Sequence, residues 1–166
     1  MMKKFVFPLL IILLAMTSCN NANNNIVFNG YKIGEVSNVG FGTSGLTASV
    51  IVDLDLTNPG SAPYTLENFN ATLYKLDGKE FATLTSDVPA TIAGKSTATV
   101  QVPISLVFSM ANAMSMAIGS IGDFDPNEFV ADFDAQVKKG AFSRHIVKKK
   151  VPIKEIARIL SEKSEE

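Results

Sequence analysis

The sequence is poor in the side chains that metal centres, disulfides and most catalytic dyads require. It contains one cysteine (Cys19), one histidine (His145) and no tryptophan. A lone cysteine cannot build an internal disulfide framework, and one Cys with one His leaves no ligand set for zinc. We therefore expect no metal, no cofactor and no enzyme of the Cys–His type. With no tryptophan and only three tyrosines, an aromatic platform for sugars is also disfavoured.

Charged residues are scarce too, at 19% of the 166 residues, and the mean hydropathy is +0.20. Disordered chains combine low hydropathy with high net charge, so this composition predicts a folded protein. A chain of this length is expected to form one domain. We predict a leader over residues 1–18, a tether over residues 19–25 and a single globular domain over residues 26–166.

The leader has the features of a secretory signal peptide. Lys3 and Lys4 form a positive start, and residues 5–15 are an apolar run. The run is too short to cross a ~30 Å hydrocarbon core, which takes about 20 helical residues. Its length is instead typical of the central region of a cleaved signal.

Cys19 follows this run and resembles the cysteine of a bacterial lipobox, with Met16 where that motif usually has leucine. The resemblance implies attachment of diacylglycerol to the Cys19 sulfur and cleavage in front of it. Stable anchoring needs two acyl signals, which a lipidated cysteine supplies. We therefore expect a lipoprotein of the bacterial cell envelope whose partner, through Cys19, is the membrane. The alternative is an ordinary signal peptide followed by a coincidental cysteine.

Residues 20–25 form an asparagine-rich tether that reaches at most ~20 Å when extended, which keeps the domain close to the bilayer. Asn20 stands directly after the cysteine in place of aspartate. By resemblance to known sorting rules, this implies the outer membrane of a host with two membranes, facing the periplasm or the surface.

Acidic and basic residues are unevenly distributed. Residues 20–137 hold 4 basic and 12 acidic side chains, whereas residues 138–166 hold 9 basic and 4 acidic ones. A basic tail can contact phospholipid headgroups or nucleic acid, and its simplest interpretation is a solvated strand face. We expect no nucleic-acid partner because the leader directs the chain out of the cytoplasm.

Apolar and polar residues alternate with period two through most of the domain. Successive side chains of a strand point to opposite faces, so each such run predicts a half-buried strand. Pro103 cannot donate to a ladder and predicts a sheet edge or a bulge. The pattern predicts a mainly β fold, an antiparallel β-sandwich of about seven to eight strands. The candidate strands cover residues 46–57, 68–74, 79–85, 98–108, 129–137 and 142–151.

Two segments have helical spacing instead. Residues 109–121 predict an inserted Met-rich helix, and an apolar stripe after Pro152 predicts a C-terminal helix. Methionine adapts to irregular apolar surfaces. Met110, Met114 and Ile118 therefore have two interpretations: they plug the core, or they form a lid over an acyl-sized cavity that holds a hydrophobic ligand.

Three other patterns are better explained by local backbone chemistry. The glycine-rich residues 40–45 have the spacing of a dinucleotide fingerprint but lead into a strand, not a helix. Asp123 and Asp125 have calcium-loop offsets without the glycine that such a loop requires. Ser143 and His145 share a strand face, but no nucleophile elbow accompanies them. We expect no metal or catalytic site at any of the three.

The strand over residues 54–59, which ends in Asn-Pro, together with Tyr64 and residues 68–74, resembles the late-embryogenesis-abundant type 2 family. That family contains the water-stress and hypersensitive-response (WHy) domain. The resemblance extends loosely over residues 27–153. It implies an immunoglobulin-like or fibronectin-like sandwich without catalytic residues. It also implies an association with stress tolerance and, for some members, with binding of lipids or other apolar molecules.

Three functions fit these observations. The leading one is a non-enzymatic, membrane-anchored binding or stress-protective module of the envelope. The second is a carrier of lipids or other hydrophobic ligands, with the Met-rich helix as lid. The third is an accessory subunit of an envelope assembly, which would expose a large apolar patch or an unpaired edge strand to a protein partner.

Overall fold

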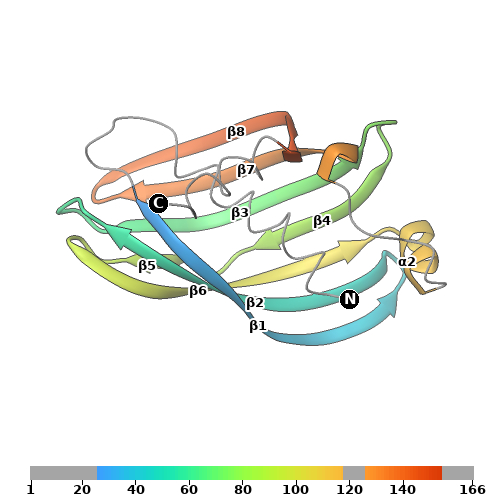
Figure 1. Ribbon diagram of the computed structural model, residues 1–166, viewed down its shortest axis with the longest axis horizontal. Coiled ribbons are helices and arrows are strands. Elements are labelled where there is room, and N and C mark those ends of the chain that lie inside the picture. Colours follow the sequence, from blue (N-terminus) through green and yellow to red (C-terminus); the bar gives the residue numbers. More distant parts are fainter. Residues whose placement is uncertain (1–25, 118–125, 155–166) are drawn as a thin grey trace.

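The computed structural model describes residues 26–117 and 126–154. The leader, Cys19 and the tether lie outside the described residues. Within them the chain is almost entirely β-structure (Figure 1). The strands are β1 (Val27–Gly42), β2 (Gly45–Asn58), β3 (Tyr64–Lys75), β4 (Glu80–Ser86), β5 (Ala90–Ile92), β6 (Ser96–Phe108), β7 (Phe129–Lys139) and β8 (Phe142–Pro152).

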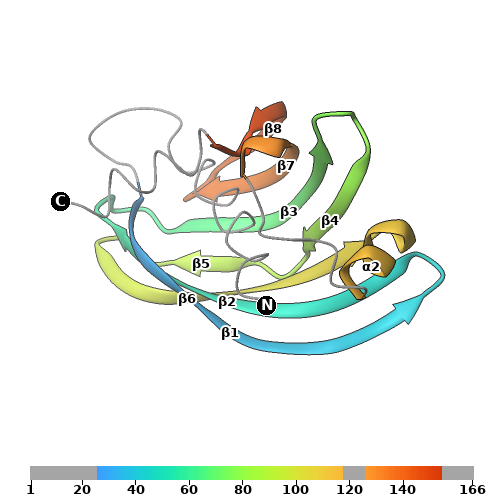
Figure 2. The same cartoon turned by 45° about the vertical axis from the view of Figure 1, so that its right-hand side comes forward.

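The strands form one antiparallel sheet in the order β1-β2-β6-β4-β3-β7-β8, with β5 beside β3. This confirms the predicted mainly β, antiparallel fold. The sheet curls so that its two halves, β1-β2-β6 and β3-β7-β8, turn the same face inward (Figure 2). Both halves contribute to one apolar core.

Alternation along the strands decides which side chains enter this core. On β2 the even-numbered residues from Ala48 to Leu54 are buried, and their odd-numbered neighbours lie on the outer face. β6, β3 and β7 follow the same rule in register with their neighbours. The largest fully buried side chains are Phe69, Phe81, Ile104, Ile153, Val50, Val52 and Val102.

β4 joins the two halves and then leaves one of them. It pairs with β6 from Ala82 opposite Phe108 to Thr85 opposite Ser105. After Ser86 the chain departs from β6, and β5 continues the pairing along β3. We call the point where β4 and β6 separate the fork.

Pro103 lies just beyond the fork. It pairs with Ile51 of β2 in an unbroken ladder, and the β4 ladder has already ended at Ser105. The residue that lacks an N–H donor therefore sits where β6 needs none on its second side. The prediction that this strand runs along a sheet edge is wrong, since β6 lies between β2 and β4, and the alternative of a bulge is wrong too; Pro103 is tolerated because the β4 ladder has ended before it.

The alternation pattern missed two strands, the three-residue β5 and the long β1. The ladder of β1 with β2 has register shifts between Phe28 and Gly30, Ile33 and Val36, and Ser37 and Gly40. Each shift moves an extra residue out of the pairing and breaks the period-two pattern.

The inserted helix, α2, spans Met110–Ala117, inside the predicted range. The N–H of Ala113 donates to the Ser109 carbonyl at 2.8 Å, and the Asn112 amide donates to the Ser109 hydroxyl. Residues 118–121 lie outside the described residues. So does nearly all of the predicted C-terminal helix, of which only Ile153 and Lys154 are described as helical.

The molecule has two distinct ends (Figure 1). We call one of them the entry end, because the first described residue, Ile26, lies there. It contains the β2–β3 corner, the β5–β6 turn and the tip of the β7–β8 hairpin. Gly140 of that tip donates to the Pro63 carbonyl at 3.0 Å, which ties it to the corner. The other, the helix end, contains α2 and the tips of the β1–β2 and β3–β4 hairpins (Figure 2).

Asn58 organises the β2–β3 corner and is 1% exposed. Its amide nitrogen donates to the carbonyls of Ala62 at 2.9 Å and Ala93 at 3.1 Å. Its amide oxygen accepts from the Gly60 N–H at 3.1 Å. The Asn58 side chain therefore links the end of β2 to the β2–β3 corner and to the β5–β6 turn.

Replacing Asn58 should leave these buried groups unpaired. We expect Asn58→Ala to lower the free energy of unfolding by about 2–4 kcal/mol, measured by urea denaturation. Asn70→Ala, at an exposed position of β3, should change it by less than about 0.5 kcal/mol. Equal effects of the two substitutions would contradict the role given to Asn58.

The same corner requires glycine at position 94. A Cβ on Gly94 would lie 2.0 Å from the backbone oxygen of Ser61, whereas a Cβ on Gly42 would meet nothing within 4 Å. We expect Gly94→Ala to cost at least about 2 kcal/mol of stability because backbone must move. Gly42→Ala should cost little, and thermal unfolding of the pair checks the contrast.

Candidate functional site

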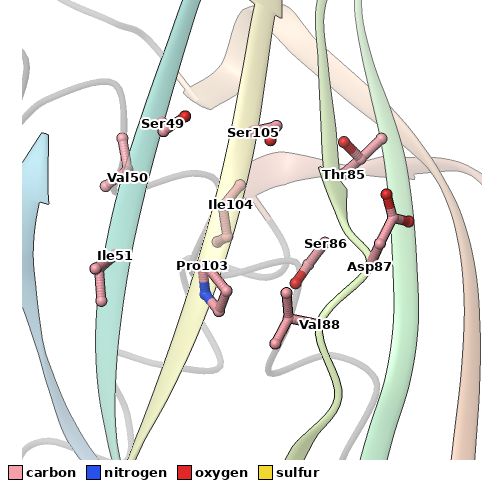
Figure 3. A pocket seen from close by; sticks show the side chains of 10 residues that line it. All are labelled: Ser49, Val50, Ile51, Thr85, Ser86, Asp87, Val88, Pro103, Ile104 and Ser105. Atoms are coloured by element: carbon pink, nitrogen blue, oxygen red, sulfur yellow. The ribbon is translucent and has the colours of Figure 1, made fainter. Parts of the chain in front are cut away.

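A shallow groove opens at the fork, between the end of β4 and the middle of β6 (Figure 3). It encloses about 180 Å³ and is reached from the outer surface past Val88 and Pro103. The departure of β4 from β6 creates this opening, because the β4 ladder ends at Ser105 and no strand pairs with Pro103 and Ile104 on that side. The complete lining is Ser49, Val50, Ile51, Thr85, Ser86, Asp87, Val88, Pro103, Ile104 and Ser105.

Ser86 is the unusual member of this lining. It is the last residue of β4 and is buried, and its hydroxyl has no hydrogen-bond partner within the described chain. A buried hydroxyl without a partner costs about 1–3 kcal/mol. The groove contains hydroxyls and one exposed carboxylate, Asp87, but no histidine, lysine or cysteine that could activate a hydroxyl as a nucleophile.

Ser143 and His145 do not form a catalytic pair. The His145 Nε2 atom lies 2.6 Å from Asp134 Oδ1, across the β7–β8 ladder. The Ser143 hydroxyl accepts instead from the side chain of Gln136. Both pairs are exposed on the outer face of the sheet. The His145–Asp134 contact was not foreseen, because the cross-strand register needed to place it is a tertiary feature.

Met110 and Met114 of α2 do not plug the core. Met110 is 43% exposed and Met114 58% exposed, whereas Ala113 is buried. The core interpretation is therefore wrong for these two side chains. Ile118, the third residue of the predicted lid, lies outside the described residues.

The reason lies in how the helix end is packed. Phe81 contacts Phe108 with ring centroids 5.9 Å apart and Phe129 with centroids 4.9 Å apart. These rings close the core at the point where α2 begins. The helix is held by its polar side, since the Asn112 amide donates to the carbonyls of Glu80 and Phe81 at 3.1 Å each.

Among the described residues, the side chains of Tyr31 and Asp77 have a pKa shifted from its ordinary value, and neither lies in the groove. Burial raises the pKa of Tyr31 on β1. A hydrogen bond from the Lys79 backbone N–H, at 3.0 Å, lowers the pKa of Asp77 in the β3–β4 turn. Both are local structural effects and indicate no general acid or base.

Within residues 26–117 and 126–154, no group of three or more His, Cys, Asp or Glu side chains is placed to hold a metal ion. Asp123 and Asp125 lie outside these ranges. The helical part of the same ranges includes no stretch with the length and apolarity of a transmembrane helix.

Several solved structures have similar folds at low identity. A protein from Archaeoglobus fulgidus has a TM-score of 0.42 and 12% identity, covering 74% of this chain and 97% of that one. The GAE domain of GGA2p from Saccharomyces cerevisiae has a TM-score of 0.32 and 12% identity, covering 80% and 93%. A late embryogenesis abundant protein studied in solution has a TM-score of 0.33 and 15% identity, covering 74% and 72%. No curated protein matches the chain.

The match to a family model is more specific. The model described as Late embryogenesis abundant protein (LEA_2) matches residues 53–155, from the middle of β2 through the end of β8. The matched region includes the Asn58 corner, the fork and both strands of the β7–β8 hairpin. This protein belongs to the late embryogenesis abundant type 2 family.

Proposed function

We propose that the protein is a lipid-anchored, non-enzymatic binding or stress-protective module of the bacterial cell envelope. The observation that carries the anchoring is the position of Cys19, directly after a charged and apolar leader and in front of a polar tether. Family membership supports a stress-related module without catalytic chemistry. The fork groove agrees with this, since its lining holds no activated nucleophile.

The fold is suited to such an anchor. Ile26, the first described residue, is buried, and Val27 pairs with Thr57 at once. The domain thus begins rigidly at its entry end. A six-residue tether between Cys19 and Ile26 spans at most ~20 Å, so the entry end is the part of the domain closest to the bilayer.

The anchor is tested by the substitution Cys19→Ser. We expect the variant to lose incorporation of radiolabelled palmitate and to move from the membrane to the soluble fraction, because one sulfur carries the whole anchor. Asn24→Ser, within the tether, should fractionate as the parent does. A Cys19→Ser protein that sediments with membranes as firmly as the parent would refute the anchor.

A second candidate function is a carrier of lipids or other hydrophobic ligands. The observation that favours it is the exposure of Met110 and Met114 on one short helix, with Phe41 of β1 exposed at the same end. Flexible thioethers can accommodate acyl chains of different shape. α2 would then act as the lid proposed above.

Native mass spectrometry distinguishes the carrier from a simple module. The acyl-free chain beginning at Asn20 should retain co-purified lipid if α2 covers a ligand, and Met110→Ser with Met114→Ser should reduce the bound fraction about tenfold, through loss of apolar contact. The double substitution Val27→Ser and Val147→Ser, which removes exposed apolar side chains outside both the fork groove and α2, is the control. A clean apo mass for the parent would eliminate the carrier.

A further inference from the structure

The entry end has a charge of one sign. It is formed by residues 26–28, 56–64, 91–98 and 138–145, which contain four cations and no Asp or Glu. Of the acidic residues on the neighbouring strands, Glu67 of β3 lies beside this end, against Lys138, whereas Asp55 and Asp53 of β2 lie farther along the sheet and accept from Thr99 and Gln101. The cations of the entry end are Lys95, Lys138, Lys139 and Arg144.

Three of these cations are available to a partner. Lys138 is paired with Glu67 at 2.8 Å. No ion pair within the described chain involves Lys95, Lys139 or Arg144. Within residues 26–117 and 126–154, no carboxylate is therefore close enough to neutralise their charge.

An aromatic side chain stands among them. Phe142, at the tip of the β7–β8 hairpin, is 83% exposed, the highest value among the exposed large hydrophobic side chains of the described chain. It pairs with Lys139, and Arg144 pairs with Val137, so Phe142, Lys139 and Arg144 lie on one face of the hairpin. This is the face whose other members, Val137 and Ile146, enter the core.

Single exposed apolar residues are common and need no explanation. What distinguishes Phe142 is its coincidence with two independent features: cations that form no ion pair within the described chain, and the end at which the chain enters the domain. An exposed aromatic ring flanked by cations is the combination that partitions into the headgroup region of an anionic bilayer.

We propose that the tip of the β7–β8 hairpin docks on the anionic bilayer surface, with Phe142 in the headgroup region and Lys139 and Arg144 against lipid phosphates. This rests on the proposed anchor for its geometry, because the tether brings the entry end to the membrane. The hairpin is then a second contact, which orients the sheet on the bilayer and points α2 and the helix end away from it.

The absence of tryptophan makes this directly measurable. Phe142→Trp introduces the sole tryptophan, and the acylated protein is reconstituted into vesicles of phosphatidylglycerol and phosphatidylcholine or of phosphatidylcholine alone. We expect blue-shifted emission and quenching by brominated acyl chains in the anionic vesicles. Phe41→Trp, at a position that is also exposed (66%) but lies at the helix end, should show neither.

The charge contribution is tested in the Phe142→Trp background. Lys139→Ser and Arg144→Ser should each lower the ratio of docked to undocked tip about fivefold, as expected for a cation at an anionic surface. Lys79→Ser and Lys149→Ser, which remove the same charge elsewhere, should change it less than about twofold. If the two pairs of substitutions lower the ratio of docked to undocked tip equally, the proposal is overturned, because the protein is then attracted to the anionic surface only by its overall positive side chains and not through the hairpin tip.

The other outcomes are equally decisive. Water-like emission from both tryptophans, or a shift at position 41 alone, would overturn docking through the hairpin. A shift at position 142 in native envelopes but not in protein-free vesicles would assign the tip to a protein partner and also overturn it. If Cys19 proves unmodified, the same emission measured on the unanchored chain mixed with vesicles still reports on the tip, so the anchor and the docking fail separately.

Discussion

The short ladder between β4 and β6 is the contact on which the architecture depends. It runs only from Ala82 opposite Phe108 to Thr85 opposite Ser105, yet it alone connects β1-β2-β6 with β3-β7-β8 through backbone hydrogen bonds in the described chain. Its early end has three consequences. β5 continues the pairing along β3, Pro103 is tolerated within β6, and the fork groove opens with Ser86 at its base.

The two ends of the sheet are chemically different because different connections close them. At the helix end, the rings of Phe81, Phe108 and Phe129 fill the core. α2 therefore lies outside the core, and its Met110 and Met114 side chains are exposed. At the entry end, the Asn58 amide and the hydrogen bond from Gly140 hold tight turns together. The tips there project their side chains beyond the core. This polarity is the basis for assigning the entry end to the bilayer and the helix end to other contacts.

The period-two pattern predicted most strands correctly, because burial of one face of an extended chain leaves a direct record in the order of residues. The prediction of an edge strand or a bulge at Pro103 failed, because a missing N–H constrains only the ladder at its own position, and β6 is paired with β4 farther along. β1 was missed because three register shifts disturb its alternation. Of the two interpretations of Met110 and Met114, the one that placed them in the core failed. A helical stripe shows that one side of a helix is apolar, but it does not show whether other side chains already fill the core beneath that helix.

The sequence by itself determined the strand faces and the Asn-Pro corner of the family, since each depends on the order of neighbouring residues. Only the tertiary structure decided which residues meet across the sheet. The side chain of His145 contacts Asp134, and the Ser86 hydroxyl has no hydrogen-bond partner within the described chain. Phe142 pairs with Lys139 at the entry end. These outcomes depend on strand order and register, which are set by the packing of the whole core and not by any local pattern.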